Sequence, residues 1–241
     1  CYLPTITDKI NASKPFLIND WYESQKISIK PVKITIPGPL TISDTVSNEY
    51  YSSDKKMNED LSLAINVEIL RLIEKGCQYI QIDEPLFARK PKEALDYGIE
   101  NLEKCFYGCG DKVEKIVHIC CGYPDKLDAV DYPKAPLKSY FEISKCLDDS
   151  SIDVVSIEDA HRHNDLKLLE LFKKTKVILG LIKIANSKIE TVEEIDHRIK
   201  EALKFIDKDK LIAAPDCGLG HLSRNLSKIK LKNLVKAAKE N

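Results

Sequence analysis

Short apolar runs alternate with amphipathic segments along most of the chain, and this alternation predicts a parallel α/β fold. Six runs have the composition of buried strands, and each precedes a segment with helical spacing of its apolar positions. The predicted strands cover residues 32–36, 79–83, 115–120, 153–158, 177–184 and 211–215. The predicted helices cover residues 58–75, 92–105, 137–147, 166–174, 192–206 and 222–239. A weaker strand pattern lies at residues 3–7.

This order of elements favours a TIM-type (β/α)8 barrel, which forms one domain over residues 1–241. A closed barrel needs eight strands, and the pattern supplies about one fewer. Cys1 is no natural start, so we expect the N-terminal strand and helix portion to be missing from this chain. A doubly wound open sheet is the structural alternative. We favour the barrel because no strand is followed by the glycine-rich loop of a dinucleotide-binding sheet.

Composition narrows the choice of partners. The formal net charge is -1, so no global field favours nucleic acid or a membrane surface. No apolar run reaches the length of about 18 residues that a membrane span needs. Eight cysteines in a domain of this size indicate reduced thiols or metal ligation rather than a disulfide framework. We therefore expect a cytoplasmic protein.

Polar residues cluster where the predicted strands end, which is where barrel enzymes place their reactive groups. In chain order these ends read Asp83-Glu84-Pro85, His118-Ile119-Cys120, Glu158-Asp159, Lys183 and Asp216-Cys217-Gly218. The carboxyl ends of apolar strands rarely carry so many ionisable side chains. The strand ends are therefore the predicted site.

Four of these residues form a donor set for a metal ion. His118 and Cys120 are two positions apart on a strand, so they share a face, and Cys121 points to the other. With Glu158 and Cys217 they supply one imidazole, two thiolates and one carboxylate, a complete tetrahedral set for zinc. Copper and iron remain open from composition alone.

Plainer interpretations of the same residues exist. A buried cysteine such as Cys217 usually packs as a small hydrophobe. Glu158 by itself would more often be a rim carboxylate paired with a base such as Arg162. Cys105 and Cys109 form a weak candidate pair around a helix end. The segment His161-Arg162-His163 would supply an acid near the site or form a solvated loop.

Five motifs, in order along essentially the whole chain, resemble the catalytic domain of cobalamin-independent methionine synthase. The first is Lys33-Ile34-Thr35-Ile36-Pro37-Gly38-Pro39-Leu40-Thr41, and the second is Gln81-Ile82-Asp83-Glu84-Pro85. The others are His118-Ile119-Cys120, Ser156-Ile157-Glu158 and Ala214-Pro215-Asp216-Cys217-Gly218-Leu219. Five ordered matches make chance an unlikely cause.

The resemblance implies both the fold and the chemistry. In that family the matching histidine, two cysteines and glutamate bind catalytic zinc in a (β/α)8 barrel. These residues correspond to His118, Cys120, Glu158 and Cys217. The family's aspartate in the Ile-Asp-Glu-Pro motif binds the amino group of homocysteine, and Asp83 matches it. The family's other homocysteine contacts, on its first barrel strand, have no counterpart here.

Three positions differ from the family on the methyl-donor side. Thr45 stands where the long synthases have a tryptophan that stacks on the folate, and Arg89 stands where they have an acidic residue on the pterin. Ala185 stands where they have the proposed proton-donating histidine. The resemblance therefore implies the zinc and the thiol more directly than the donor, which is a folate or a corrinoid.

We therefore predict a zinc-dependent methyltransferase that acts on a small thiol, most closely homocysteine, and gives methionine. The nearest rival shares the metal and transfers another alkyl group, as the epoxyalkane–coenzyme M transferases do. A metal-free barrel like uroporphyrinogen decarboxylase is a rival of another class, but that family lacks the His-x-Cys and Pro-Asp-Cys-Gly pairing. A third possibility is a binding protein with structural zinc, whose sites are usually closed by cysteine-rich ligands.

Overall fold

A computed structural model describes residues 3–129 and 132–241 of the chain. The protein divides into two compact units. The first runs up to His118 and also includes Ser150–Asp153, and the second comprises Ile119–Asp149 and Val154–Asn241. This division does not test the single domain expected over residues 1–241, which stays a prediction.

Parallel strands form the centre of the first unit. They are β2 (Lys33–Pro37), β4 (Tyr79–Asp83) and β5 (Glu114–Ile119), in that order, with β5 in this unit as far as His118. The register is continuous, so Ile36 lies beside Ile82, which lies beside Val117. All three side chains are buried. The same register places Asp83 beside His118 at the carboxyl edge of the sheet.

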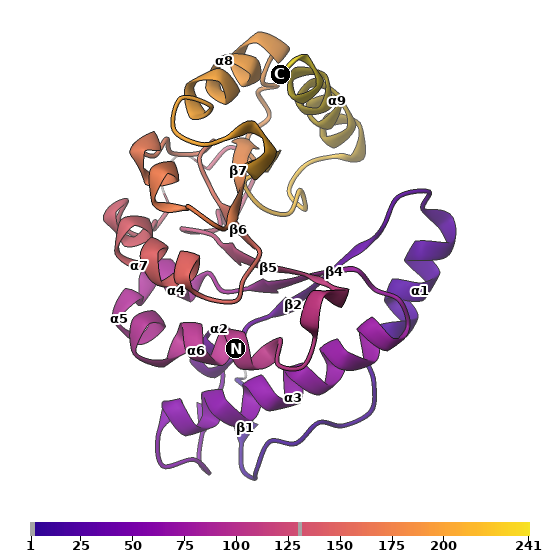
Figure 1. Ribbon diagram of the computed structural model, residues 1–241, viewed down its shortest axis with the longest axis vertical. Coiled ribbons are helices and arrows are strands. Elements are labelled where there is room, and N and C mark those ends of the chain that lie inside the picture. The colour runs from indigo at the N-terminus through magenta and orange to yellow at the C-terminus, as the bar shows by residue number, and fades with distance from the viewer. Residues whose placement is uncertain (1–2, 130–131) are drawn as a thin grey trace. The chain divides into compact units, whose positions relative to one another are not determined.

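Helices of the first unit cover these strands (Figure 1). They are α1 (Ile18–Ile27), α2 (Pro39–Asp44), α3 (Asp54–Glu74), α4 (Leu86–Arg89), α5 (Pro91–Glu93) and α6 (Ile99–Cys105). The long helix α3 begins at Ser53, whose Oγ accepts from the Lys56 N–H at 3.4 Å. It packs against α6, and Asn66 Nδ2 donates to the carbonyl oxygens of Cys105 and Tyr107 at 2.9 and 2.8 Å.

The second unit repeats the parallel arrangement. Its strands are β6 (Val154–Ile157), β7 (Lys176–Ile182) and β8 (Leu211–Pro215), and its α-helices are α7 (Lys138–Asp149), α8 (Val192–Ala202) and α9 (Arg224–Glu240). The register of β7 and β8 shifts between Gly180 and Ile182. A Cβ atom at Gly180 would lie 2.0 Å from Asp216 Oδ1, so only glycine allows Asp216 to approach β7 this closely.

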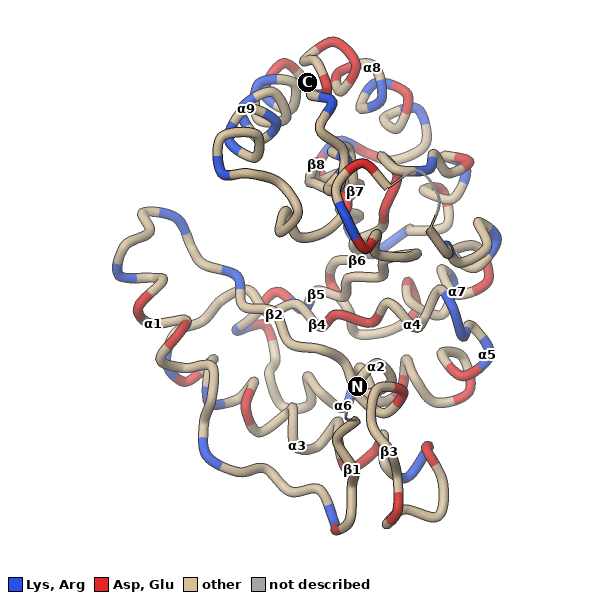
Figure 2. The backbone as a smooth tube through the Cα atoms, turned by 180° about the vertical axis from the view of Figure 1, so that it is seen from behind, with Lys and Arg blue, Asp and Glu red and all other residues tan. Residues whose placement is uncertain are grey.

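Helix α9 is anchored to β7 by a buried cation. Figure 2 shows that basic residues recur along α9, and one of them, Lys230, is fully buried. Lys230 Nζ lies 3.0 Å from Glu190 Oε2 and donates to the Lys183 carbonyl oxygen at 3.1 Å. Glu190 Oε1 accepts from the Lys183 N–H at 3.0 Å. Both backbone groups of Lys183, directly after β7, are therefore held by this ion pair.

All six predicted strands of the α/β pattern are confirmed, most within one or two residues of their ends. The weaker strand at residues 3–7 is present as β1 (Thr5–Ile6), which pairs with β3 (Ser47–Asn48) rather than with the larger group. Strands are predicted well here because their buried side chains form nearly continuous apolar runs.

Several predicted helices differ from the structure at their ends or in type. Helix α3 begins at Asp54 rather than at residue 58, and α8 ends at Ala202 rather than at residue 206. The segment predicted as an α-helix at residues 166–174 is a 3-10 helix that covers Leu166–Leu171. Asp148 Oδ1 accepts hydrogen bonds from the N–H groups of Lys174 and Thr175, which a longer helix would use for its own backbone bonds. The helix expected at 92–105 starts at Pro91 and contains a π-helical turn, Ala94–Gly98, before α6. Helix α1 was not predicted.

Within the described ranges, no helix combines the length and apolar character needed to cross a membrane. The cytoplasmic location stays a prediction.

Candidate metal centre

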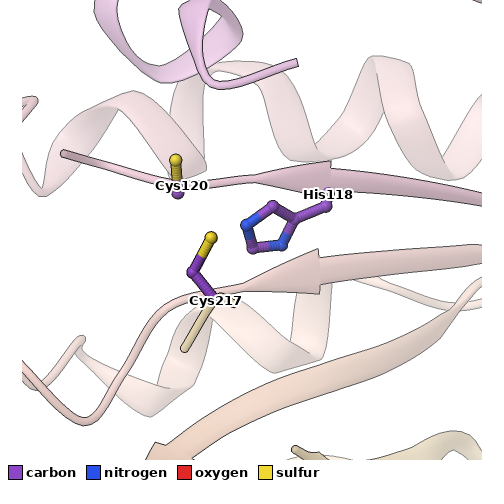
Figure 3. A group of neighbouring side chains, drawn as sticks. All are labelled: His118, Cys120 and Cys217. Atoms are coloured by element: carbon purple, nitrogen blue, oxygen red, sulfur yellow. The ribbon is translucent and has the colours of Figure 1, made fainter. Parts of the chain in front are cut away.

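Three of the four predicted metal ligands lie close together (Figure 3). One ligand atom from each of His118, Cys120 and Cys217 lies within 4.8 Å of the others. His118 and Cys120 come from β5 and the residue after it, and Cys217 follows β8 by two residues. His118 and Cys120 are buried and Cys217 is half-buried. The chain thus brings two thiols and one imidazole to a common point.

The chemistry and spacing of this group fit a zinc ion. Tetrahedral zinc, with bonds of about 2.3 Å to sulfur and 2.0 Å to nitrogen, holds such ligand atoms about 3.5–3.8 Å apart. The three donors lie within 4.8 Å of one another, so a side-chain rotation of at most about 1 Å brings them to that spacing. Sulfur and imidazole donors disfavour magnesium and calcium, which bind oxygen.

Glu158 is not part of this group of three. It lies directly after β6, and its side chain is buried. Its backbone is held by side chains on both sides: its N–H donates to the Tyr140 hydroxyl at 3.2 Å, and its carbonyl oxygen accepts from Asn164 Nδ2 at 2.6 Å. The position of Glu158 is therefore fixed by its neighbours, and its role as fourth ligand stays a prediction.

Asp83 is the last residue of β4 and is half-buried. Its Oδ1 accepts from Gln81 Nε2 at 2.6 Å, and Gln81 Oε1 in turn accepts from Lys33 Nζ. This polar row lies on one face of neighbouring strands, since alternate residues of a strand share a face. It orients the Asp83 carboxylate beside His118.

Glu84 links two motifs that looked separate in the sequence. It is fully buried, and its carboxyl group accepts from the N–H groups of Leu40 and Thr41 at 2.9 and 3.0 Å and from the Thr41 hydroxyl at 2.7 Å. A Cβ atom at Gly38 would lie 2.2 Å from Glu84 Cδ, so the glycine makes room for the carboxyl group. Burial raises the pKa of Glu84 to about 7, and the hydrogen bonds partly oppose this.

Asp216 and His161 form a buried pair that the sequence did not reveal. Asp216 is fully buried, and its Oδ2 lies 2.8 Å from His161 Nδ1. The solvated-loop interpretation is therefore wrong for His161, whose side chain is 9% exposed, and right for His163, whose side chain is 66% exposed. The available signal was the position of Asp216 directly before Cys217.

The remaining described cysteines do not belong to this group of three. Cys121 contacts Tyr140 of α7, and burial raises the pKa of its thiol. Burial likewise raises the pKa values of Cys105 and Cys109. A thiol with a raised pKa is a weak nucleophile at neutral pH, and burial of these cysteines suits packing.

The three positions that differ from the family on the donor side lie on different parts of the chain. Thr45 is the C-cap of α2 and is exposed, and Arg89 ends α4 and is exposed. Ala185 is buried, and its carbonyl oxygen accepts from the Asp128 N–H at 2.8 Å.

Comparison with known proteins places this geometry in context. The family model described as the catalytic domain of cobalamin-independent synthase matches residues 1–240. A methionine synthase from Saccharolobus solfataricus is 34% identical over 98% of this chain and 66% of its own length. A methionine synthase from Sulfurisphaera tokodaii is 31% identical over 98% of this chain and 64% of its own length. The chain thus spans about two thirds of the length of these curated relatives.

A solved structure shares the fold. It is a B12-independent methionine synthase from Shewanella sp. W3-18-1 in complex with selenomethionine. It is 33% identical, covers 99% of this chain and 70% of its own chain, and superposes with a TM-score of 0.88. This similarity confirms the α/β fold of the TIM-barrel type that the pattern of strands and helices predicted.

Proposed function

Since the chain belongs to the cobalamin-independent synthase catalytic-domain family, we propose that it holds a zinc ion and transfers a methyl group to a small thiol, homocysteine, to give methionine. The observation that carries this proposal is the grouping of His118, Cys120 and Cys217 at strand ends. Glu158 is the proposed fourth ligand. A carboxylate is easier to exchange than a third thiolate, so this donor set suits a site that admits a substrate rather than a closed structural one.

Zinc bound there would supply one chemical effect. It would hold a thiol, whose ordinary pKa is about 8.5, as the thiolate at neutral pH. The protein residues supply the rest. Two cysteine thiolates and the Glu158 carboxylate carry three negative charges, which keep the electron density on an incoming sulfur high. The strand ends that carry the donors would fix the line of attack in the direct displacement at the methyl carbon.

Asp83 is the proposed contact for the substrate amino group. It lies beside His118 on the neighbouring strand, at the usual spacing of about 4.8 Å between strand backbones. A thiol amino acid whose sulfur reached the metal ligands would therefore have its ammonium group within reach of the Asp83 carboxylate. Selenomethionine bound to the Shewanella relative is an analogue of the product of such a reaction and supports this choice of acceptor.

The methyl donor is proposed only as a class, a methylated folate or a methylated corrinoid. Thr45, Arg89 and Ala185 replace the folate-side residues of the long synthases, so these positions give folate no specific support. The relatives are named methionine synthase, and this name does not specify the methyl donor. Methylcobalamin and methyltetrahydrofolate are therefore both needed in any assay.

The test crosses acceptors with donors and uses the complete protein loaded with zinc. Homocysteine and coenzyme M are each offered with methyltetrahydrofolate and with methylcobalamin. We expect methionine from homocysteine with at least one donor. Asp83→Asn should raise the KM for homocysteine by about 10–100-fold, because it removes a charge-assisted hydrogen bond to the ammonium group.

Coenzyme M provides the matched control, since it has a thiol and no amino group. Any turnover of coenzyme M should respond little to Asp83→Asn. An enzyme that alkylates coenzyme M and ignores homocysteine would overturn the proposed acceptor and favour the epoxyalkane–coenzyme M transferase rival. Product formation without any metal would overturn the proposal as a whole.

A further inference from the structure

The backbone segments that carry the candidate ligands are tied together by two buried polar side chains, Tyr140 and Asp216. Neither belongs to the predicted donor set. Both lie in the second unit, as do all the groups they bind. Tyr140 comes from helix α7, and Asp216 lies directly before Cys217.

Tyr140 joins the end of β5 to the end of β6. Its hydroxyl donates to the Ile119 carbonyl oxygen at 2.7 Å and accepts from the Glu158 N–H at 3.2 Å. Ile119 is the residue between His118 and Cys120. The Tyr140 hydroxyl therefore holds the peptide group between the candidate ligands His118 and Cys120 and also the peptide group of Glu158. Tyr140 is only 2% exposed.

Asp216 joins the end of β8 to the loop after β6. Its Oδ1 accepts from the N–H groups of Asp159 and Ala160 at 2.9 and 2.8 Å, and its Oδ2 accepts from the His161 N–H at 2.7 Å. Its own N–H donates to the Ile182 carbonyl oxygen at 3.0 Å. The carboxylate thus holds the three residues that follow Glu158 against the residue that precedes Cys217.

Burial of these groups is costly unless they are fully hydrogen-bonded. A phenol hydroxyl or a carboxylate moved from water into a protein interior loses its hydration, and an apolar core side chain at the same place would avoid that cost. Here the polar atoms bind main-chain groups next to ligands. Residues of this kind around metal ligands orient them, and their loss typically lowers metal affinity by about 10–100-fold.

We propose that Tyr140 and Asp216 are positioning residues of the metal centre, which set the spacing of the ligand-bearing ends of β5, β6 and β8 before the metal binds. This inference rests on the proposed function, because it assumes that these strand ends bind zinc. On this proposal, metal affinity depends on Tyr140 and Asp216 although neither residue is a metal ligand.

The decisive variant is Tyr140→Phe, which removes the bridging hydroxyl and keeps the ring. Tyr51→Phe is the matched control, because the Tyr51 hydroxyl also bridges two groups, accepting from the Ile10 N–H at 2.7 Å and donating to Asp60 Oδ2 at 2.8 Å. Tyr51 belongs to the first unit and adjoins no candidate ligand in sequence. Asp216→Asn is the second variant, since in either orientation its amide NH2 faces a backbone N–H in place of an acceptor oxygen.

Two readouts separate positioning from general stability. The first is the zinc dissociation constant of the complete protein, measured by competition with a chromophoric chelator. The second is the absorption spectrum of the protein loaded with Co2+, which reports the ligand geometry. Circular dichroism shows whether each variant is folded.

We expect Tyr140→Phe and Asp216→Asn to weaken zinc binding by about 10–100-fold and to alter the Co2+ spectrum, while Tyr51→Phe changes neither. Folded Tyr140→Phe protein with the wild-type zinc affinity and Co2+ spectrum would overturn the inference and leave the proposed function intact. Wild-type protein that binds neither metal would overturn the proposed function itself. If Asp216→Asn does not fold, Tyr140→Phe alone decides.

Discussion

Hydrogen bonds from buried side chains to backbone groups recur around the candidate ligands. Glu84 binds the start of α2, Asn164 and Tyr140 bind Glu158, and Asp216 binds the loop after β6. Backbone groups in such loops cannot find partners within a strand or helix, and buried groups without partners are costly. Asn164, Tyr140 and Asp216 thus stabilise the segment around Glu158, and Glu84 stabilises the first turn of α2.

Glu84 makes the stability of the protein dependent on pH. Its pKa is about 7 in the folded protein, against an ordinary value of 4.5. Between these two values the folded protein binds one more proton than the unfolded chain, so its stability falls as pH rises. The full difference corresponds to about 3 kcal/mol.

Glu84→Gln should remove this dependence, because the amide does not titrate. Urea unfolding at about pH 5 and about pH 8 gives the free energy of unfolding at each end of the window. We expect the wild type to lose more stability than the variant between the two conditions. Equal losses in the two proteins would contradict the raised pKa of Glu84.

At this scale the sequence predicted candidate ligands but not the side chains that hold their backbone. The proximity of His118, Cys120 and Cys217 could be predicted because strand parity and strand ends are visible in the sequence. Tyr140 was not found, because its hydroxyl reaches Ile119 only once α7 packs on the sheet. A hydrogen bond between distant segments leaves no periodic signal in the chain.

Elements attach to one another through a few specific polar groups as well as through apolar faces. Helix α9 shows this most clearly, because Lys230 binds both Glu190 and the end of β7. Glu190 lies just before the capping residue of α8, Thr191. One buried ion pair therefore fixes α9, the start of α8 and the end of β7.

Lys230→Met should destabilise the protein by about 3–5 kcal/mol, because it leaves the Glu190 carboxylate without its cation. Lys232→Met is the matched control, since Lys232 is an exposed lysine on the same helix and should cost less than about 0.5 kcal/mol. Urea unfolding measures both changes. The double variant Lys230→Met/Glu190→Gln should recover part of the loss, and a Lys230→Met protein as stable as the control would contradict this account of the ion pair.

Strands were predicted more accurately than helices, for a physical reason. The ends of β4 and β8 match their predicted residues, because buried strands need unbroken apolar runs. The 3-10 helix at Leu166–Leu171 was predicted as an α-helix, because its apolar spacing alone does not reveal that Asp148 takes the next N–H groups. Helix α1 has a weak apolar face, with Trp21 as its buried residue.

For the whole molecule, the parallel α/β order and the family follow from motifs distributed along the full chain. The family model matches residues 1–240, and the solved Shewanella relative covers 99% of the chain. The chain nevertheless spans about two thirds of its curated relatives, so the activity of a whole synthase stays a proposal. The predicted missing N-terminal portion also stays a prediction.

Metal content tests the central claim most directly. Complete protein, purified without added metal and without chelators, is assayed for zinc by mass spectrometry, in parallel with Cys217→Ser. We predict about one zinc per wild-type chain and a large loss of zinc in the variant, because a serine hydroxyl is a poor ligand at neutral pH. Wild-type protein that lacks zinc, together with a Cys217→Ser protein of unchanged methyltransferase activity, would contradict the account.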